Sequence, residues 1–147
     1  MIRKINPDDK EIFIQLTKDF YNTDAVLSKI PTENIELTFE KIIDDSPYVD
    51  GYLYLHKGNV AGYCLLSFTY SNEAGGLIVS IEELYIVPKY QRRGIGSKFL
   101  DFLDTTYHNK VAAMCLDVVK TNQTARQLYY KKGFKDLKYL HMIKKCD

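Results

Sequence analysis

Apolar residues recur along the chain with two different periods, and these periods separate helices from strands. Met1 to Ile5 has the pattern of a short first strand. Pro7-Asp8-Asp9 opens a helix, and Thr32-Glu33 opens a second one after Pro31 interrupts the chain. The apolar sides of these helices are predicted to be Ile12, Phe13, Leu16 and Phe20, and then Ile35, Phe39, Ile42 and Ile43.

The middle of the chain has the pattern of consecutive strands joined by short turns. Tyr52 to Leu55 and Val60 to Tyr70 are predicted strands, and Lys57-Gly58-Asn59 supplies the turn between them. The glycine-rich run Asn72 to Gly76 leads into a long strand, Leu77 to Val87. Both faces of this last strand are mostly apolar, so we expect it in the interior of a sheet.

Helices and strands alternate in the second half of the chain. We expect a helix from Gly94 to about His108, a strand from Val111 to Val119 and a helix from Asn122 to Lys131. Phe134 to Lys144 is predicted to form one or two final strands. This alternation favours parallel pairing, whereas the tight turns upstream favour antiparallel pairing. The pattern therefore predicts a mixed α/β (α+β) domain.

Composition and charge narrow the classes of function. The 147 residues fit one domain, 1–147, with enough chain to bury a core. The formal net charge of +1 provides no strong basic field, so we expect no nucleic-acid partner. No apolar run reaches the length of a membrane span, and the first residues lack the apolar core of a signal peptide. We expect a cytoplasmic protein with no membrane partner.

The three cysteines give no sign of a metal site or a disulfide framework. Cys64, Cys115 and Cys146 are widely separated and odd in number, and none has the paired spacing of metal ligands. Cys64 and Cys115 lie in apolar runs, where cysteine is usually a small buried residue. No metal is expected, and none of the three has a recognisable nucleophile setting.

The most informative chemistry lies where the strand Leu77 to Val87 ends and the next helix begins. Gly94 and Gly96 allow the backbone to turn tightly and to approach a ligand. The first N–H groups of a helix have no partner within it, and the helix dipole there attracts anions. The pattern therefore predicts a phosphate-binding turn formed by Gln91, Arg92, Arg93, Gly94, Ile95, Gly96 and Ser97.

The spacing of these glycines excludes two common nucleotide-binding motifs. The dinucleotide fingerprint requires a third glycine where the chain has Phe99, and the P-loop requires Gly-Lys-Ser/Thr where it has Gly96-Ser97-Lys98. Two glycines alone are equally compatible with an ordinary turn between a strand and a helix.

Two blocks of sequence resemble the GNAT N-acetyltransferase superfamily. Gln91 to Gly96 is similar to its Q/R-x-x-G-x-G/A signature, and Asn122 to Phe134 matches N-x-x-A-x-x-L-Y-x-x-x-G-F at every specified position. The resemblance covers the C-terminal half of the chain, and the N-terminal third carries little of it. It implies a twisted, mostly antiparallel central sheet with parallel pairing at the cofactor site, flanked by about four helices.

The resemblance also implies an activity and a cosubstrate. The chain would be an acetyl-CoA-dependent N-acetyltransferase that moves an acetyl group directly to a primary amine of a small molecule or peptide. The turn would bind the pyrophosphate of CoA, and the main chain of Tyr85, Ile86 and Val87 would bond the pantetheine arm. Asn122 would contact the same arm, although it also suits the N-cap of its helix. Homodimers are common in the superfamily, so a homodimer is compatible with it.

Glu82 and Glu83 are the leading candidates for a general base. Strict alternation along the strand puts the two carboxylates on opposite faces. The face of Glu82 would also carry Ile78, Ser80, Leu84 and Ile86, and the face of Glu83 would carry Val79, Ile81, Tyr85 and Val87. An amine acceptor is mostly protonated at neutral pH, and a carboxylate can remove its proton. The resemblance makes Glu82 the first candidate, Glu83 the second and Asp117 on the neighbouring strand the third. Ion pairing or a solvated strand edge is the alternative for each.

Tyr129 is the candidate acid, because it occupies the tyrosine position of the second block. A departing thiolate leaves more readily when it receives a proton, and a neutral tyrosine can donate one. The alternative is that Tyr129 is an aromatic residue of the core. Tyr130 would point about 100° away on the helix, so the two tyrosines are not interchangeable.

The sequence does not identify the amine that accepts the acetyl group. Aromatic and acidic residues in segments that would frame the acceptor cleft suit a cationic amine, although each is also compatible with an ordinary core or surface role. They are Phe20, Tyr21, Asp24, Tyr48, Tyr70, Asn72 and Glu73. A protein N-terminus is a rival acceptor. A sensor or regulatory module that binds CoA or another acyl-CoA with little turnover is the rival function.

Overall fold

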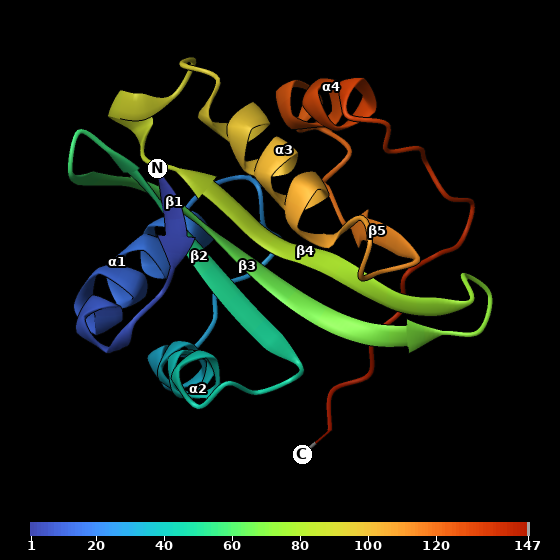
Figure 1. The fold of residues 1–147 in the computed structure, drawn as a ribbon, viewed down its shortest axis with the longest axis horizontal. Coiled ribbons are helices and arrows are strands. Elements are labelled where there is room, and N and C mark those ends of the chain that lie inside the picture. Colours follow the sequence, from blue (N-terminus) through green and yellow to red (C-terminus); the bar gives the residue numbers. More distant parts are fainter. Residues whose placement is uncertain (147) are drawn as a thin grey trace.

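The computed structural model, which describes residues 1–146, shows one five-stranded sheet with helices on both faces (Figure 1). Its strands lie in the order β1-β2-β3-β4-β5, and all neighbours are antiparallel except the parallel pair β4–β5. The strands are β1 (Ile2–Lys4), β2 (Val49–His56), β3 (Asn59–Ser71), β4 (Gly76–Ile86) and β5 (Ala113–Leu116). The mixed, mostly antiparallel sheet predicted from the sequence is confirmed.

Two helices cover each face of the sheet (Figure 1). The helices are α1 (Lys10–Tyr21) and α2 (Thr32–Ile43) on one face, and α3 (Ile95–Tyr107) and α4 (Gln123–Lys131) on the other. On the first face, Phe13 of α1 meets the fully buried Tyr63 of β3 edge-on, with ring centroids 5.9 Å apart. On the second face, Phe99 and Leu103 of α3 pack against the sheet. The helical periodicity of the sequence therefore identified the buried sides correctly.

A bulge at Glu82 interrupts β4 and changes which residues share a face. In the β3–β4 register, Leu65 pairs with Glu83 and Leu66 pairs with Ile81, which leaves Glu82 as the extra residue. Val79 and Ile81 before the bulge pack on the α3 side, and so do Leu84 and Ile86 after it. Tyr85 packs on the α1 side instead. The strict alternation expected along this strand is therefore wrong, because one inserted residue shifts the phase.

Two predictions about the last strands are also corrected. The strand expected over 111–119 is shorter, because Val111 donates to the carbonyl of Tyr107 at the end of α3 and only Ala113–Leu116 pair with β4. The final strands expected within 134–144 are absent from the part of the chain that the structure describes. A strand needs a neighbouring backbone to bond, and no main-chain hydrogen bond joins residues 135–146 to the sheet.

Two further findings apply to residues 1–146. No helix there has both the length and the apolar character needed to cross a membrane. No group of three or more His, Cys, Asp or Glu side chains in these residues has the arrangement needed to hold a metal ion.

Candidate functional site

The turn between β4 and α3 presents open main-chain donors. The backbone is left-handed at Arg92 (φ 62°) and at Gly94 (φ 76°), and a Cβ on Gly94 would meet no atom within 4 Å. Lys98 is the first residue whose N–H bonds back along the helix, to the Gly94 carbonyl at 3.0 Å. Among the described residues, the N–H groups of Ile95, Gly96 and Ser97 have no main-chain acceptor. They remain available to an anion.

The side chains of this turn divide into structural and exposed groups. Gln91 Nε2 donates to the Ile86 carbonyl at 2.9 Å, so this side chain braces the turn against the end of β4. Arg93 lies over the ring of Tyr90 at 5.7 Å, and Arg92 and Arg93 are both exposed. Ile95 is buried in the core, and Ser97 is half-buried. Exposed guanidinium groups beside free N–H donors suit a ligand that carries phosphate groups.

Gly96 lies where α3 packs against α4. A Cβ at this position would stand 3.2 Å from Cδ2 of Leu128, so the two helices approach closely. The glycine therefore has a packing role in addition to any contact with a ligand.

The strands β4 and β5 part next to this turn. Their parallel pairing runs from Ile78–Ala113 to Ile81–Leu116, whereas β4 continues to Ile86. Val87 donates its N–H to the Ala61 carbonyl of β3 at 2.8 Å. Because bonding alternates along an antiparallel ladder, the main-chain N–H of Ile86 points away from β3. Ile86 therefore offers a free N–H where the strands part. The main chain of Val87 was also predicted to bond a cofactor, but its N–H is already used by Ala61.

Tyr129 of α4 lies on the α3/α4 face and packs against Phe134, with ring centroids 5.9 Å apart. Burial, with a smaller contribution from nearby Cys64, raises the pKa of Tyr129 to about 12. Cys64 pairs with Leu84, just after the bulge of β4. The hydroxyl of Tyr129 therefore stays neutral at physiological pH, on the α3/α4 face and near Cys64. Asn122 Oδ1 accepts from the Ala125 N–H at 3.3 Å and so caps the helix that carries Tyr129.

The two glutamates lie together on the α1/α2 face. Glu83 is buried and accepts hydrogen bonds from the hydroxyls of Tyr21 at 2.6 Å and Tyr63 at 2.7 Å. Glu82 is exposed and accepts from the hydroxyl of Ser67, a residue on the same side of β3 as Tyr63 and Leu65. The bulge therefore places both carboxylates on one face.

The two carboxyl groups have different environments, because Glu83 is buried and Glu82 is exposed. Burial raises the pKa of Glu83, and the charge of Glu82 adds to that shift, although the two tyrosine donors oppose it. Tyr63 and Tyr21 were not identified as partners of Glu83 in the sequence. They lie 20 and 62 positions away from it, so no local pattern signals the contact. Asp117, the third candidate base, is exposed and instead bonds Nδ1 of His141 at 2.6 Å.

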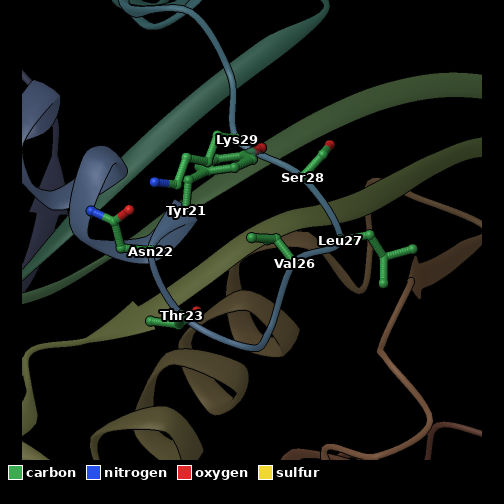
Figure 2. A pocket seen from close by; sticks show the side chains of 7 residues that line it. All are labelled: Tyr21, Asn22, Thr23, Val26, Leu27, Ser28 and Lys29. Carbon is green, nitrogen blue, oxygen red and sulfur yellow. The ribbon is translucent and has the colours of Figure 1, made fainter.

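The loop after α1 forms a pocket beside these carboxylates (Figure 2). The pocket has a volume of about 300 Å³, and Figure 2 shows Val26 pointing into the arch of the loop and Leu27 pointing away. Its lining residues are Tyr21, Asn22, Thr23, Val26, Leu27, Ser28 and Lys29. Since Tyr21 also donates to Glu83, the pocket and the carboxylate pair share a wall.

The structure brings few of the predicted acceptor residues to this pocket. Tyr21 lines it, and Asp24 belongs to its loop. Phe20 is buried among the rings of Tyr21, Tyr63 and Tyr85, so its role is packing. The remaining predicted residues lie elsewhere: they are the exposed Tyr48, and Tyr70, Asn72 and Glu73 at the β3–β4 hairpin.

The position of the hairpin along β4 explains this difference. Tyr70 pairs with Leu77, which is five residues before the bulge. At the rise of a β-strand this separation is roughly 17 Å. The hairpin residues therefore do not line the pocket beside the carboxylates.

Comparison with known proteins identifies the family of the chain. Residues 48–136 match the profile of the family described as Acetyltransferase (GNAT) domain. Thialysine N-epsilon-acetyltransferase of Bos taurus is 36% identical over 87 residues, which cover 53% of this chain and 46% of that relative. The match thus spans about half the length of the curated relative.

Solved structures share the fold. A possible acetyltransferase from Clostridium difficile 630 superposes with a TM-score of 0.83 at 16% identity, covering 100% of this chain and 97% of the other. The aminoglycoside N-acetyltransferase AAC(6')-Iy in complex with CoA superposes with a TM-score of 0.80 at 17% identity, covering 99% and 93%. The family profile covers more than half of the chain and includes the carboxylates, the turn and Tyr129. The chain belongs to the GNAT acetyltransferase domain family.

Proposed function

We propose that this chain is an acetyl-CoA-dependent N-acetyltransferase that transfers the acetyl group directly to a primary amine of a small molecule or peptide. One observation carries the proposal. The bulge of β4 sets Glu82 and Glu83 on one face, and Tyr129 lies on the other face near Cys64, which pairs with Leu84 just after the bulge. A base and an acid on opposite sides of parting strands suit an acyl transfer between them.

Glu82 is the proposed general base. Its exposed carboxylate can meet a protonated amine from solvent and remove the proton that blocks attack. Both oxygens of Glu83 already accept tyrosine hydrogen bonds, so Glu83 is a positioning residue that keeps Tyr21 at the wall of the pocket. Together the two carboxylates attract a cationic acceptor.

The cofactor side supplies the complementary groups. Bound acetyl-CoA presents the acetyl group as a thioester. Its phosphates would be held by the N–H groups of Ile95, Gly96 and Ser97 and by the exposed arginines of the turn. The free N–H of Ile86 would polarise the carbonyl, and the neutral hydroxyl of Tyr129 would protonate the departing sulfur.

Small amines are the favoured acceptors. The pocket of about 300 Å³ beside the carboxylates suits a small or slender group. The relatives point the same way, since one is named for thialysine and a structural neighbour for aminoglycosides. Diamines, lysine and its analogues, and aminoglycosides are therefore the first acceptors to assay.

The test follows free thiol release from acetyl-CoA in the presence of these amines and of peptides with a free N-terminus. We expect release that depends on the amine. Glu82→Gln should lower kcat/KM about 100-fold, with unchanged stabilisation of the protein by CoA. Glu40→Gln removes an exposed carboxylate from α2 and serves as the matched control.

Two outcomes would contradict the proposal, and a third would change the acceptor. Stabilisation by CoA without thiol release for any amine would favour a sensor or regulatory module. If CoA neither binds nor stabilises the protein, the cofactor assignment itself fails. Preferential release with peptides would instead assign a protein N-terminus as the acceptor.

A further inference from the structure

A second pocket, of about 520 Å³, lies at the end of α3 that is remote from the turn between β4 and α3. Because α3 has thirteen residues, from Ile95 to Tyr107, its two ends are roughly 18 Å apart. The aromatic residues of this pocket belong to the core of the α3/α4 face, whereas Glu82 and Glu83 lie on the α1/α2 face. The pocket is therefore distinct from both halves of the candidate acetyl-transfer site.

Three aromatic rings form the inner wall of this pocket. They belong to Tyr52 of β2, Phe68 of β3 and Tyr107 of α3. The ring centroids of Phe68 and Tyr107 are 5.6 Å apart, and Tyr52 packs edge-on against Phe102 with centroids 5.0 Å apart. These contacts hold the rings in place, so they offer a preformed apolar surface to another aromatic ring. The volume also falls in the range of about 300–1,000 Å³ that is typical of small-molecule sites.

The hydroxyls of Tyr52 and Tyr107 carry one proton more than their own contact uses. The two oxygens lie 2.8 Å apart, and both residues are more than nine-tenths buried. Burial raises the pKa of both hydroxyls and the charge of nearby Asp50 adds to both shifts, so both stay protonated. One hydroxyl donates to the other, and among the described residues neither has a further partner. The second proton is therefore available to an acceptor oxygen inside the pocket.

Two charged side chains of opposite sign stand at the mouth of this pocket. Asp45 lies in the loop between α2 and β2, and Lys110 follows α3; both are exposed. The other two charged residues of the pocket, Lys4 and Asp50, are already joined to each other at 2.9 Å. Within residues 1–146, neither Asp45 nor Lys110 forms an ion pair. They are therefore available to a ligand that carries both an ammonium and a carboxylate group.

We propose that this pocket is a second binding site, for a free aromatic amino acid whose ring carries a hydroxyl group. The ring would lie against Phe68 and Tyr107, and its hydroxyl oxygen would accept the unused tyrosine proton. The ammonium group would meet Asp45, and the carboxylate would meet Lys110. An apolar interior, a buried donor and opposite charges at the mouth each match a different part of such a ligand. Binding here does not depend on the proposed acetyl transfer.

The test titrates the full chain with L-tyrosine and follows the heat of binding. We expect one site with a dissociation constant below about 1 mM. L-Phenylalanine lacks the hydroxyl and should bind at least about fivefold more weakly, because the buried donor stays unsatisfied. Tyramine lacks the carboxylate, and 3-(4-hydroxyphenyl)propanoate lacks the ammonium group. Each should bind at least about tenfold more weakly than L-tyrosine.

Substitutions assign the binding to this pocket. Lys110→Gln should remove the advantage of L-tyrosine over tyramine, and Asp45→Asn should remove its advantage over 3-(4-hydroxyphenyl)propanoate. Both side chains are exposed, so the fold should be retained. Lys10→Gln removes an exposed lysine from α1 and should leave every affinity unchanged. Thr106→Trp places a large ring inside the pocket and should abolish binding, with circular dichroism as the check on folding.

Three results would overturn the proposal. The first is the absence of binding at the solubility limit of L-tyrosine. The second is equal affinity for L-tyrosine and all three analogues. The third is an affinity for L-tyrosine that Lys110→Gln, Asp45→Asn and a folded Thr106→Trp variant leave unchanged, which would place the ligand elsewhere. None of these measurements uses thiol release, so their failure is distinguishable from failure of the proposed function.

Discussion

The two faces of β4 hold the two halves of the candidate site, and they are built in different ways. On the α3/α4 face, the groups proposed to bind CoA follow one another within residues 86–97, and several are main-chain N–H groups. On the α1/α2 face, Glu83 is held by Tyr63 and Tyr21, which lie 20 and 62 positions away. These contacts are made entirely by side chains.

This difference predicts that the two faces respond to different kinds of substitution. Anion binding by main-chain N–H groups depends on the space and the charge around the turn, and it tolerates many different side chains there. A buried carboxylate depends on its donors, since the oxygen left unpaired by the loss of a donor costs free energy wherever water cannot take the donor's place. The cofactor side should therefore respond most to added bulk or charge, and the acceptor side to the loss of single hydroxyl groups.

The largest expected effect tests the cofactor side. Gly96→Asp should weaken CoA binding at least about 100-fold, because it places a negative charge at a helix N-terminus proposed to hold phosphates. Gly96→Ala is the control. Its Cβ meets only the end of the flexible Leu128 side chain at 3.2 Å, so affinity should change little. Calorimetric titration distinguishes the two, and retained affinity in the aspartate variant would place the phosphates elsewhere.

The next effect concerns Tyr129, the proposed general acid. Tyr129→Phe should lower kcat about 10- to 100-fold, because its hydroxyl would no longer protonate the leaving sulfur. The dissociation constant for CoA should stay the same. Tyr130→Phe, on the exposed side of α4, should leave kcat unchanged. Steady-state kinetics with the best amine provides the readout, and an unchanged rate for Tyr129→Phe would return this residue to the role of a core aromatic.

The third effect is the loss of stability when either tyrosine that donates to Glu83 is replaced. Tyr63→Phe should destabilise the protein by about 2 kcal/mol, since the hydroxyl and the carboxylate oxygen it serves are buried. Tyr21 is partly exposed, so water can replace its hydroxyl and Tyr21→Phe should cost about 1 kcal/mol or less. Urea unfolding measures both. Equal losses of unfolding free energy would mean that the burial of the donor does not determine the cost of removing it.

The smallest effect is the pH dependence of stability caused by Glu83. Its pKa is raised by folding, so ionisation of this group costs the folded state free energy. Wild-type protein should therefore lose stability relative to Glu83→Gln as the pH rises from the ordinary carboxyl value near 4.5 through the raised pKa. Urea unfolding at several pH values measures the difference. A relative gain in wild-type stability over this range would show that the tyrosine donors outweigh burial.

Much of the fold follows from local patterns. The apolar periodicity placed α1, α2, α3 and α4 and the hairpin strands close to their observed bounds. The bulge at Glu82 was not predicted, because nothing in Ile81 to Leu84 distinguishes an inserted residue from regular alternation. The final strand failed for another reason, since 134–144 has a strand pattern but finds no partner backbone in the described chain.

The sequence by itself determined the proposed cofactor side of this protein. The Gly94–Gly96 turn and the helix of Tyr129 are local arrangements, set by backbone conformation within a few residues. Only the tertiary structure decided the acceptor side. It brought Glu82 and Glu83 to one face and placed the hydroxyls of Tyr21 and Tyr63 on the buried carboxylate. Contacts between distant side chains depend on how sheets and helices pack, and no period in the sequence encodes that packing.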